Sequence, residues 1–486
     1  IDIFLNPKSV AVIGASKNPT KGGHRIVDNL VRNNFKGKIY PINPNSEGTL
    51  FGLEFKKSVL DIENNVDLAI FYVPNRKIPP ILKECIQNGI KGAIIEASGF
   101  EEVGKEGLAL RDQILKITDN FSRIRILGPN CMGLTRIDGD SNLKNDKNGG
   151  LFTSFGVFSK YKRGNIAIIS QSGMLNGGYL MYLMEKYSDL GIRYSCTIGN
   201  KMDLSEIEFL EYFIEDPTVN VIAIYLESFK NPRKFIELCQ KVQKIPNKTI
   251  IFIKGGITTQ GQKATLSHTG SMAENSELIN AIIKQSGVIH ANSFYELFQY
   301  ARTFSMMYTD NKMMPKQGNI SMITGSGGAG TIVADITSKY NLKFPNFDSK
   351  IYNTLVDVFP EWMPPNRFAL IDFWPAMEKA MMNNINPGHL MTSVLELLLE
   401  DEKIEGILIM MFCSRQFRNL NNYEYIIDNI NHTSKPIFFW LIGEIREVER
   451  ITRRMAEKNI LVFPNLEDMV KNFWILLQDS KKKNFC

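Results

Sequence analysis

The sequence predicts an α/β protein made of doubly wound, mostly parallel sheets, and three observations support this fold class. Strand-like runs alternate with amphipathic helical stretches along the chain. Those runs are apolar throughout, as expected for strands covered by helices on both faces. A strand followed by a glycine-containing turn and a helix opens the chain, and the pattern returns near residues 164 and 318. We therefore expect three consecutive domains, spanning 1–142, 143–312 and 313–486.

The first domain is predicted to hold five strands, with helices over Gly23–Asn33 and Ile78–Asn88 between them. The strands are expected at Val10–Ile13, Ile39–Ile42, Leu68–Val73, Gly92–Glu96 and Ile124–Leu127. Residues Asp140 to Gly150 are polar and rich in glycine and asparagine, which predicts a linker or an exposed loop.

The second and third domains repeat the alternation. In the second, a strand from Gly164 leads through Gln171-Ser172-Gly173 into a helix over Met174–Tyr187, and further elements are expected at Val219–Leu226, Pro232–Gln243 and Thr249–Lys254. In the third, a strand from Gly318 leads into a helix over Thr331–Ser338, and further elements are expected at Gly406–Phe412, Pro436–Leu441 and Glu467–Gln478.

Composition excludes several classes of protein. The chain of 486 residues is 44% hydrophobic and 22% charged, with a net charge of +6, which is ordinary for a globular protein. The sequence has no basic stripe with interleaved aromatic residues, the pattern that would indicate nucleic-acid binding. No apolar run is long enough to span a membrane. The six cysteines lie far apart without a C-x-x-C pair, which argues against zinc or disulfides and favours a cytoplasmic location. No metal site is expected.

The first glycine turn, Val12-Ile13-Gly14-Ala15-Ser16, is not a dinucleotide fingerprint. The G-x-G-x-x-G pattern needs glycine at 16 and 19, where the chain has Ser16 and Pro19, and no acidic residue ends the second strand. A nicotinamide-dependent dehydrogenase is therefore disfavoured. Backbone amides of this turn can still bind phosphate, with Lys17, Lys21 and Lys38 as further contacts. The alternative is a tight turn without a ligand.

His268 is the most informative single residue. It lies within Leu266-Ser267-His268-Thr269-Gly270-Ser271-Met272-Ala273, and small, hydroxyl-bearing and glycine residues surround it. We expect an exposed turn there, rich in hydrogen-bond donors, which suits a histidine that carries a phosphoryl group. The other four histidines have no such setting.

Three other features are ambiguous or structural. The turn holding Gly325, Gly327, Gly328 and Gly330 lacks the lysine of a P-loop, so turn geometry and ligand binding are both open. Cys131 is expected to be a buried small residue rather than a reactive thiol. The methionines are expected to fill the core.

Seven segments in order resemble the alpha subunit of the NDP-forming (ADP-forming) acyl-CoA synthetases, the acetate–CoA ligase family related to the succinyl-CoA synthetase alpha subunit. The segments are Val10–Ser16, Gly37–Pro44, Leu127–Gly133, Ile169–Gly173, Gly199–Lys201, Ile224–Glu227 and Ser267–Ser271. The resemblance implies a Rossmann-like CoA-binding domain followed by two flavodoxin-like domains of the succinyl-CoA-synthetase type.

The resemblance also implies a reaction in three steps and a set of site residues. Phosphate attacks an acyl-CoA, the acyl phosphate phosphorylates His268, and phosphohistidine phosphorylates ADP; in reverse, ATP drives formation of the thioester. Glu227 would orient His268, although an ordinary strand-end carboxylate remains the alternative. Phosphate would meet Ser172, Gly173, Gly199, Asn200, Thr269 and Gly270. Coenzyme A would meet Gly14, Ala15, Ser16, Lys38, Asn43, Val73, Pro74, Ser98 and Asn130.

The chain departs from the family pattern in a few places. Ser228 follows the strand-end glutamate where glycine is frequent, and Ala329 replaces a proline in the third glycine turn. Aromatic residues in Pro360–Arg367 and Asp372–Ala376 resemble a subgroup and suggest a substrate other than acetate.

The sequence contains no block resembling an ATP-grasp domain, which in the family binds ADP or ATP and Mg²⁺. The resemblance therefore implies a beta subunit, in an α2β2 assembly, or a fused ATP-grasp domain. The rival interpretation is a non-catalytic CoA-binding regulatory protein of the same fold. Retention of both His268 and Glu227 speaks against it, because a sensor of coenzyme A needs neither residue.

Overall fold

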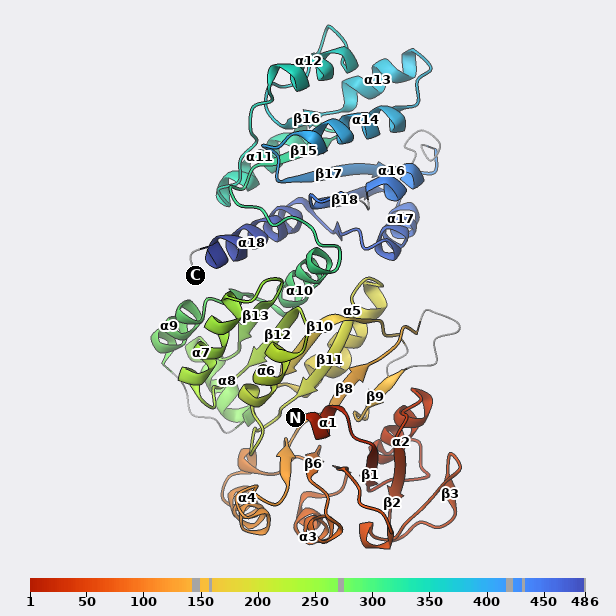
Figure 1. Ribbon diagram of the computed structural model, residues 1–486, viewed down its shortest axis with the longest axis vertical. Helices are drawn as coiled ribbons and strands as arrows, with labels where there is room; N and C mark the ends of the chain where they lie inside the picture. Colours follow the sequence, from red (N-terminus) through yellow and green to blue (C-terminus); the bar gives the residue numbers. More distant parts are fainter. Residues whose placement is uncertain (142–148, 157–159, 270–274, 417–422, 431–432, 485–486) are drawn as a thin grey trace. The chain divides into compact units, whose positions relative to one another are not determined.

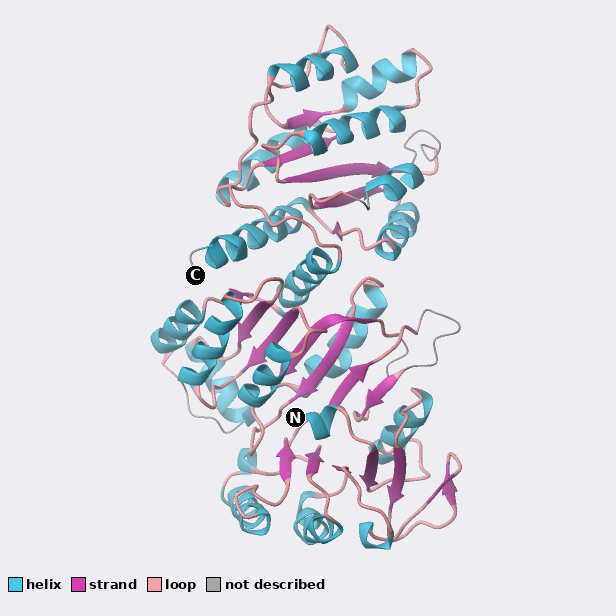
Figure 2. Cartoon of the chain, viewed as in Figure 1, coloured by secondary structure: helices cyan, strands magenta, loops and turns pink. Residues whose placement is uncertain are grey.

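The computed structural model describes the chain except residues 142–148, 157–159, 270–274, 417–422, 431–432 and 485–486. It falls into two compact units, Ile1–Ala301 and Arg302–Cys486, called here the first and second units. Helix α10 (Phe294–Thr309) runs across the boundary. Helices cover both faces of the sheets in each unit (Figure 2), as predicted for doubly wound α/β domains.

The first sheet of the first unit is fully parallel, with the strand order β2-β1-β5-β6-β7. Its strands are β1 (Ser9–Ile13), β2 (Lys38–Ile42), β5 (Leu68–Phe71), β6 (Gly92–Ile95) and β7 (Arg125–Leu127). The helical segments around it are α1 (Asp2–Leu5), α2 (Gly22–Arg32), η1 (Val59–Asp61), η2 (Asn75–Lys77), α3 (Ile78–Asn88), η3 (Glu101–Val103) and α4 (Lys105–Thr118). A small hairpin, β3 (Thr49–Leu50) and β4 (Leu53–Glu54), follows β2.

The second sheet has seven strands in the order β14-β13-β12-β10-β11-β8-β9, and β8 and β9 are antiparallel. The strands are β8 (Leu134–Ile137), β9 (Gly150–Phe152), β10 (Arg163–Ser170), β11 (Ile192–Thr197), β12 (Val221–Leu226), β13 (Thr249–Lys254) and β14 (Ile289–His290). Its helical segments are the π-helical turn η4 (Leu175–Tyr179), α5 (Leu180–Lys186), α6 (Glu206–Glu215), α7 (Pro232–Gln243), α8 (Thr259–Thr269) and α9 (Ser276–Ser286). The boundary expected at residue 142 thus lies between two strands of this sheet.

The two sheets of the first unit share one continuous core. One hydrophobic cluster joins α2 residues such as Val27 to β10 residues such as Ile169 and to the aromatic residues Phe209 and Phe235 of α6 and α7. A second cluster packs α3 and α4 on the other face of the first sheet. This packing joins the α2 side of the first sheet to the second sheet, and the two sheets lie next to each other in Figure 1.

The second unit contains one parallel sheet with the order β16-β15-β17-β18-β19. Its strands are β15 (Ile320–Thr324), β16 (Leu370–Asp372), β17 (Gly406–Cys413), β18 (Ile437–Gly443) and β19 (Val462–Phe463). Its helices are α11 (Gly327–Lys339), α12 (Ser349–Val358), α13 (Trp374–Met382), α14 (Pro387–Glu400), α16 (Tyr423–Ile430), α17 (Ile445–Glu457) and α18 (Leu466–Asn484). Helices α12, α14, α16 and α17 pack on one face of this sheet, and α11 contacts α18.

The structure changes some of the expected elements. The helix expected over Met174–Tyr187 is helical from Gly173, contains the π-helical turn η4 and continues as α5 from Leu180. Helix α8 spans Thr259–Thr269 and includes the first residues of the segment around His268 that was expected to be a turn. The five cysteines in the described part of the chain are buried and unpaired, and no described helix has the length and apolar character needed to cross a membrane.

Candidate active site

The carboxyl ends of three neighbouring strands of the second sheet bring the central polar residues together. Gln171 follows β10, Glu227 follows β12 and Gly255 follows β13. The Gln171 side-chain carbonyl accepts hydrogen bonds from the backbone N–H groups of Glu227 (2.8 Å) and Ser228 (3.1 Å). The Gln171 amide thereby fixes the backbone at the point where Glu227 leaves the sheet.

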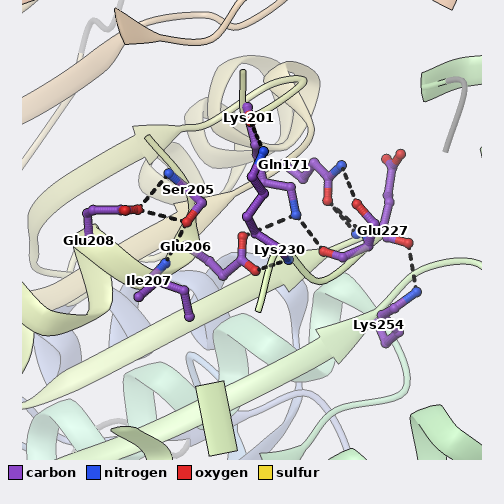
Figure 3. Close-up of polar contacts among 10 residues, drawn as sticks. Gln171, Lys201, Ser205, Glu206, Ile207, Glu208, Glu227, Lys230 and Lys254 are labelled. Carbon is purple, nitrogen blue, oxygen red and sulfur yellow. Dashed lines mark hydrogen bonds and ion pairs between the residues drawn. The ribbon is translucent and has the colours of Figure 1, made fainter. Parts of the chain in front are cut away.

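Glu227 is 7% exposed. Its carboxylate forms a hydrogen bond in addition to those of its backbone. Its Oε1 accepts a hydrogen bond of 3.0 Å from the Tyr225 hydroxyl. Burial, and after it the Glu227 carboxylate, raises the pKa of the Tyr225 phenol, so this group stays a donor at neutral pH. Figure 3 shows the Glu227 side chain pointing away from the Lys254 ammonium.

Two buried lysines hold the same strand end by its carbonyl groups. The Lys254 ammonium donates to the carbonyls of Glu227 (2.7 Å) and Gly255 (2.8 Å). The Lys201 ammonium donates to the Ser228 carbonyl (2.6 Å) and forms a buried ion pair with Glu206 (3.1 Å). Glu206 also accepts from the backbone N–H of Lys230, as Figure 3 shows. The ammonium groups of Lys201 and Lys254 thus both hold the start of the loop after β12.

The turn after β10 is the start of a helix aimed at the same edge of the sheet. The Ser170 hydroxyl donates to the Ser172 carbonyl (2.7 Å), and Gly173 is the first helical residue. A Cβ on Gly173 would lie 2.8 Å from the Met132 side chain. A larger residue at 173 would therefore require the Met132 side chain to move. Free N–H groups and the dipole at a helix start favour an anion.

The loop after β7 meets the loop after β11 across the two sheets. Gly199 (φ +53°) lies so close to this loop that a Cβ would be 2.1 Å from the Pro129 carbonyl oxygen. The backbone N–H of Asn200 donates to that carbonyl (2.9 Å), and its side chain contacts Asn130 (3.3 Å) and Glu102 (2.6 Å). Asn130, Gly199 and Asn200 thus lie together, and their roles stay predictions.

The segment predicted to carry the phosphoryl group is helical up to Thr269. The backbone of Ser267–Thr269 belongs to α8, so the expectation of a turn at His268 is wrong. Gly270 lies outside the described residues, and the roles of His268, Thr269 and Gly270 stay predictions. Gly255 lies in the segment that leads to α8. Its N–H donates to the carbonyl of Leu226 (2.8 Å), the residue before Glu227.

The first glycine turn forms a tight cradle at the carboxyl edge of the first sheet. Gly14 (φ +88°) approaches Tyr72 and Val73 so closely that a Cβ would be 2.3 Å from the Tyr72 carbonyl oxygen. The Asn43 side chain donates to the Ala15 carbonyl (2.8 Å). The turn lies where the chain reverses from β1–β2 to β5, the usual place for a ligand in such a sheet.

The remaining predicted contacts with coenzyme A divide into two groups. Pro74 and Ser98 lie in adjacent loops after β5 and β6, linked by the Asn75 side chain, which donates to the Gly99 carbonyl (2.6 Å). Lys38 starts β2 and pairs with Ser9 at the amino end of β1. The structure therefore does not bring Lys38 to the Gly14 turn: its backbone lies at the opposite edge of the sheet.

Sequence reasoning missed several residues that build the site. Gln171 and Lys201 stood in matched segments without a role, and Tyr225 and Lys254 had no distinguishing motif. Glu96, directly after β6, is 8% exposed, and neither carboxylate oxygen has a hydrogen-bond partner among the described residues. Burial raises the pKa of Glu96 well above the ordinary carboxyl value.

Two domain families match the first unit. A CoA binding domain matches residues 8–136, and a succinyl-CoA ligase like flavodoxin domain matches residues 163–304. The subunit alpha of acetate–CoA ligase (ADP-forming) I from Pyrococcus furiosus is 32% identical over 99% of this chain and 98% of its own length. The chain belongs to the ADP-forming acetate–CoA ligase family.

Longer relatives and a solved structure support the same membership. The ADP-forming acetate–CoA ligase II of Archaeoglobus fulgidus is 34% identical over 99% of this chain, which spans 67% of that protein. A Candidatus Korarchaeum cryptofilum acetyl-coenzyme A synthetase 1, solved with phosphate and ADP, superposes with a TM-score of 0.84 at 27% identity. The match covers 100% of this chain and 97% of that one. The α/β fold with CoA-binding and succinyl-CoA-ligase-like domains is thus confirmed.

Proposed function

We propose that this chain is the alpha part of an ADP-forming acyl-CoA synthetase in which His268 carries the phosphoryl group. The observation that supports this most is the buried Glu227 carboxylate. Gln171 and Lys254 hold the backbone of Glu227 at the carboxyl ends of the parallel strands, and the Tyr225 hydroxyl donates to its carboxylate. A strand-end carboxylate whose backbone and side chain are both held is typical of a group whose orientation matters for chemistry.

The first step forms an acyl phosphate. A phosphate oxygen attacks the thioester carbonyl carbon, the carbon–sulfur bond breaks, and the thiolate of coenzyme A leaves and takes up a proton. The start of the helix at Gly173, with the backbone of Gly199 and the Asn200 amide, is suited to hold the phosphate. The Gly14 turn would hold the diphosphate of coenzyme A through backbone amides, with Asn43, Pro74 and Ser98 around it.

The second step moves the phosphoryl group to the protein. An imidazole nitrogen of His268 attacks phosphorus, and the carboxylic acid leaves as its anion. Glu227 would accept a hydrogen bond from the other ring nitrogen, which selects the nucleophilic tautomer and stabilises the charged ring. The final transfer to ADP requires a nucleotide site with Mg²⁺, which we assign to an ATP-grasp subunit or fused domain. Relatives named as subunit alpha and longer single-chain relatives are consistent with either arrangement.

The test combines the purified chain with phosphate and each of a panel of acyl-CoAs that includes acetyl-CoA, with and without a candidate ATP-grasp subunit, followed by intact-mass analysis. We expect an acid-labile gain of one phosphoryl group that is absent in His268→Ala, and ATP formation only when the partner and ADP are added. Binding of coenzyme A without any adduct, for every acyl-CoA tried, would contradict the proposal and favour the regulatory alternative.

A further inference from the structure

Glu96 is a buried carboxyl group that the proposed reaction does not use. It follows β6 directly, is 8% exposed, and neither of its carboxylate oxygens has a hydrogen-bond partner among the described residues. Buried polar side chains are rarely left without partners, so such an exception calls for a physical explanation. The position of Glu96 offers one, because the residues on either side of it hold the loop that carries Asn130.

The backbone on both sides of Glu96 binds the loop after β7. The Ala97 carbonyl accepts a hydrogen bond from the backbone N–H of Asn130 (2.9 Å). The Ile95 carbonyl accepts one from the Cys131 thiol (3.4 Å). Both carbonyls belong to residues next to Glu96 in the chain. A shift of the backbone at Glu96 is therefore passed directly to Asn130 and Cys131.

The Glu96 side chain has room because residue 133 is glycine. A Cβ on Gly133 would lie 2.9 Å from Oε1 of Glu96 and 2.5 Å from Oγ1 of Thr153. Gly133 has a left-handed backbone (φ +69°). Its carbonyl accepts hydrogen bonds from the hydroxyl (2.6 Å) and the backbone N–H (3.1 Å) of Thr197. The loop after β7 thus covers the carboxyl group and is itself held to β11 of the second sheet.

The described groups that face Glu96 are neutral. Gly133 and Thr153 carry no charge, and burial, followed by the effect of Glu96, raises the pKa of the Cys131 thiol to about 12. Burial alone raises the pKa of Glu96, so no charged side chain among the described residues offsets it. An ionised Glu96 would need water or a hydrogen-bond donor. It can reach either only if the loop that covers it moves.

We propose that Glu96 is a positioning residue whose protonated form holds the loop after β7 in place for the acyl-CoA. Loss of the proton displaces this loop together with Asn130, and the chain then binds acyl-CoA less tightly. Because the pKa of Glu96 is raised in the folded chain, the loop is in place below that pKa and is released as the pH rises through it. That Asn130 meets acyl-CoA rests on the proposed function; that Glu96 controls the loop does not.

The first test measures binding of acetyl-CoA and of phenylacetyl-CoA to the full chain by calorimetry at pH 6 and pH 9. Thioesters are the probes because they have no thiol that ionises in this range. We expect the affinity of the natural chain, relative to that of Glu96→Gln, to fall at least tenfold from pH 6 to pH 9. Titrations in two buffers with different heats of ionisation should show that binding takes up more protons in the natural chain than in Glu96→Gln.

The second test follows the loop itself, without a ligand, by hydrogen exchange and mass spectrometry. At pH 9 the peptide that contains residues 128–133 should exchange at least tenfold faster in the natural chain than in Glu96→Gln, and at pH 6 the two should agree. Glu63→Gln, at an exposed carboxyl group, is the matched control and should behave like the natural chain. If Glu96→Gln misfolds, Glu96→Leu supplies a second side chain that is neutral at every pH.

The possible outcomes separate this inference from the proposed function. Equal exchange in the natural chain and Glu96→Gln at pH 9, or an affinity ratio that does not change with pH, would overturn the role of Glu96 even if His268 becomes phosphorylated. Faster exchange spread over the whole chain would also overturn it, because it would indicate a general loss of stability. Faster exchange confined to the loop, in a chain that binds neither thioester, would support the control of the loop by Glu96 and contradict the proposed function.

Discussion

The turn after β10 in the first unit and the turn after β15 in the second unit start from the same local pattern but have opposite surroundings. Both follow an apolar parallel strand and lead through glycine into a helix. Around Gln171 lie Glu227, Lys201 and Lys254, in a dense set of polar contacts. Around Gly325 lie methionines and aromatic rings that enclose a cavity. The shared turn supplies a helix start, and the neighbouring strand ends decide whether its surroundings are polar or apolar.

The largest expected effect comes from removing the charge at Glu227, which tests whether the polar turn is catalytic. Glu227→Gln keeps the shape but loses the anion that would stabilise a charged imidazole ring. We expect a decrease of about 10²–10⁴-fold in the rate of phosphoryl transfer to His268, the usual scale for such a group. Rapid-quench mass spectrometry measures the rate. Glu215→Gln, at an exposed carboxylate, is the control, and equal rates in both variants would refute the role of Glu227.

The next test concerns the buried ion pair between Lys201 and Glu206, which helps to hold the loop after Glu227. The side chains are 4% and 0% exposed, so Lys201→Met leaves a buried carboxylate without its partner. We expect a loss of about 3–5 kcal/mol in the free energy of unfolding. Lys241→Met breaks an exposed pair with Glu215 and should cost less than about 1 kcal/mol. Urea titrations compare the two, and a double variant, Lys201→Met with Glu206→Leu, should recover part of the loss.

A third test loosens the contact between the two sheets of the first unit. Gly199→Ala would place a Cβ 2.1 Å from the Pro129 carbonyl oxygen at a left-handed backbone position. We expect a cost of about 2–4 kcal/mol, because overpacking adds to the left-handed strain. Gly52→Ala is the control, since Gly52 has φ +82° but open space around its Cβ position. Similar melting temperatures for the two variants would contradict this cost and would show that the 128–133 loop moves to accommodate the Cβ.

The smallest expected effect concerns Glu96, the buried carboxyl group without a hydrogen-bond partner among the described residues. Burial raises the pKa of Glu96 in the folded state. The contribution of the protonated carboxyl group to stability is therefore complete below the ordinary carboxyl pKa, and it is lost as the pH rises through the pKa of the folded state. Glu96→Gln should therefore gain about 1–3 kcal/mol over the natural chain at pH 8, and less at pH 5. Urea unfolding at both pH values measures this, with exposed Glu63→Gln as control. A gain that does not change with pH would contradict a protonated Glu96.

The sequence predicts the three glycine turns well because apolar runs and glycine are local signals. It does not predict the lysine clamps, since Lys201 and Lys254 look like ordinary surface residues until the sheet places their ammonium groups beside the Glu227–Gly255 carbonyls. The turn expected at His268 fails because the local small residues do not stop α8 before Thr269. The cavity is also invisible locally, because its walls come from β15, α13, α14 and β17, which lie far apart in the chain.

The most direct test of the central claim locates the phosphoryl group itself. The chain is treated in parallel with acetyl phosphate and with a larger aromatic acyl phosphate, which supply the second step without coenzyme A or a partner, and is digested and mapped at neutral pH to preserve phosphohistidine. We predict one phosphoryl group, on His268, which forms much more slowly in Glu227→Gln. A phosphoryl group on another residue, such as His290, or none with either acyl phosphate in a folded chain, would contradict the account.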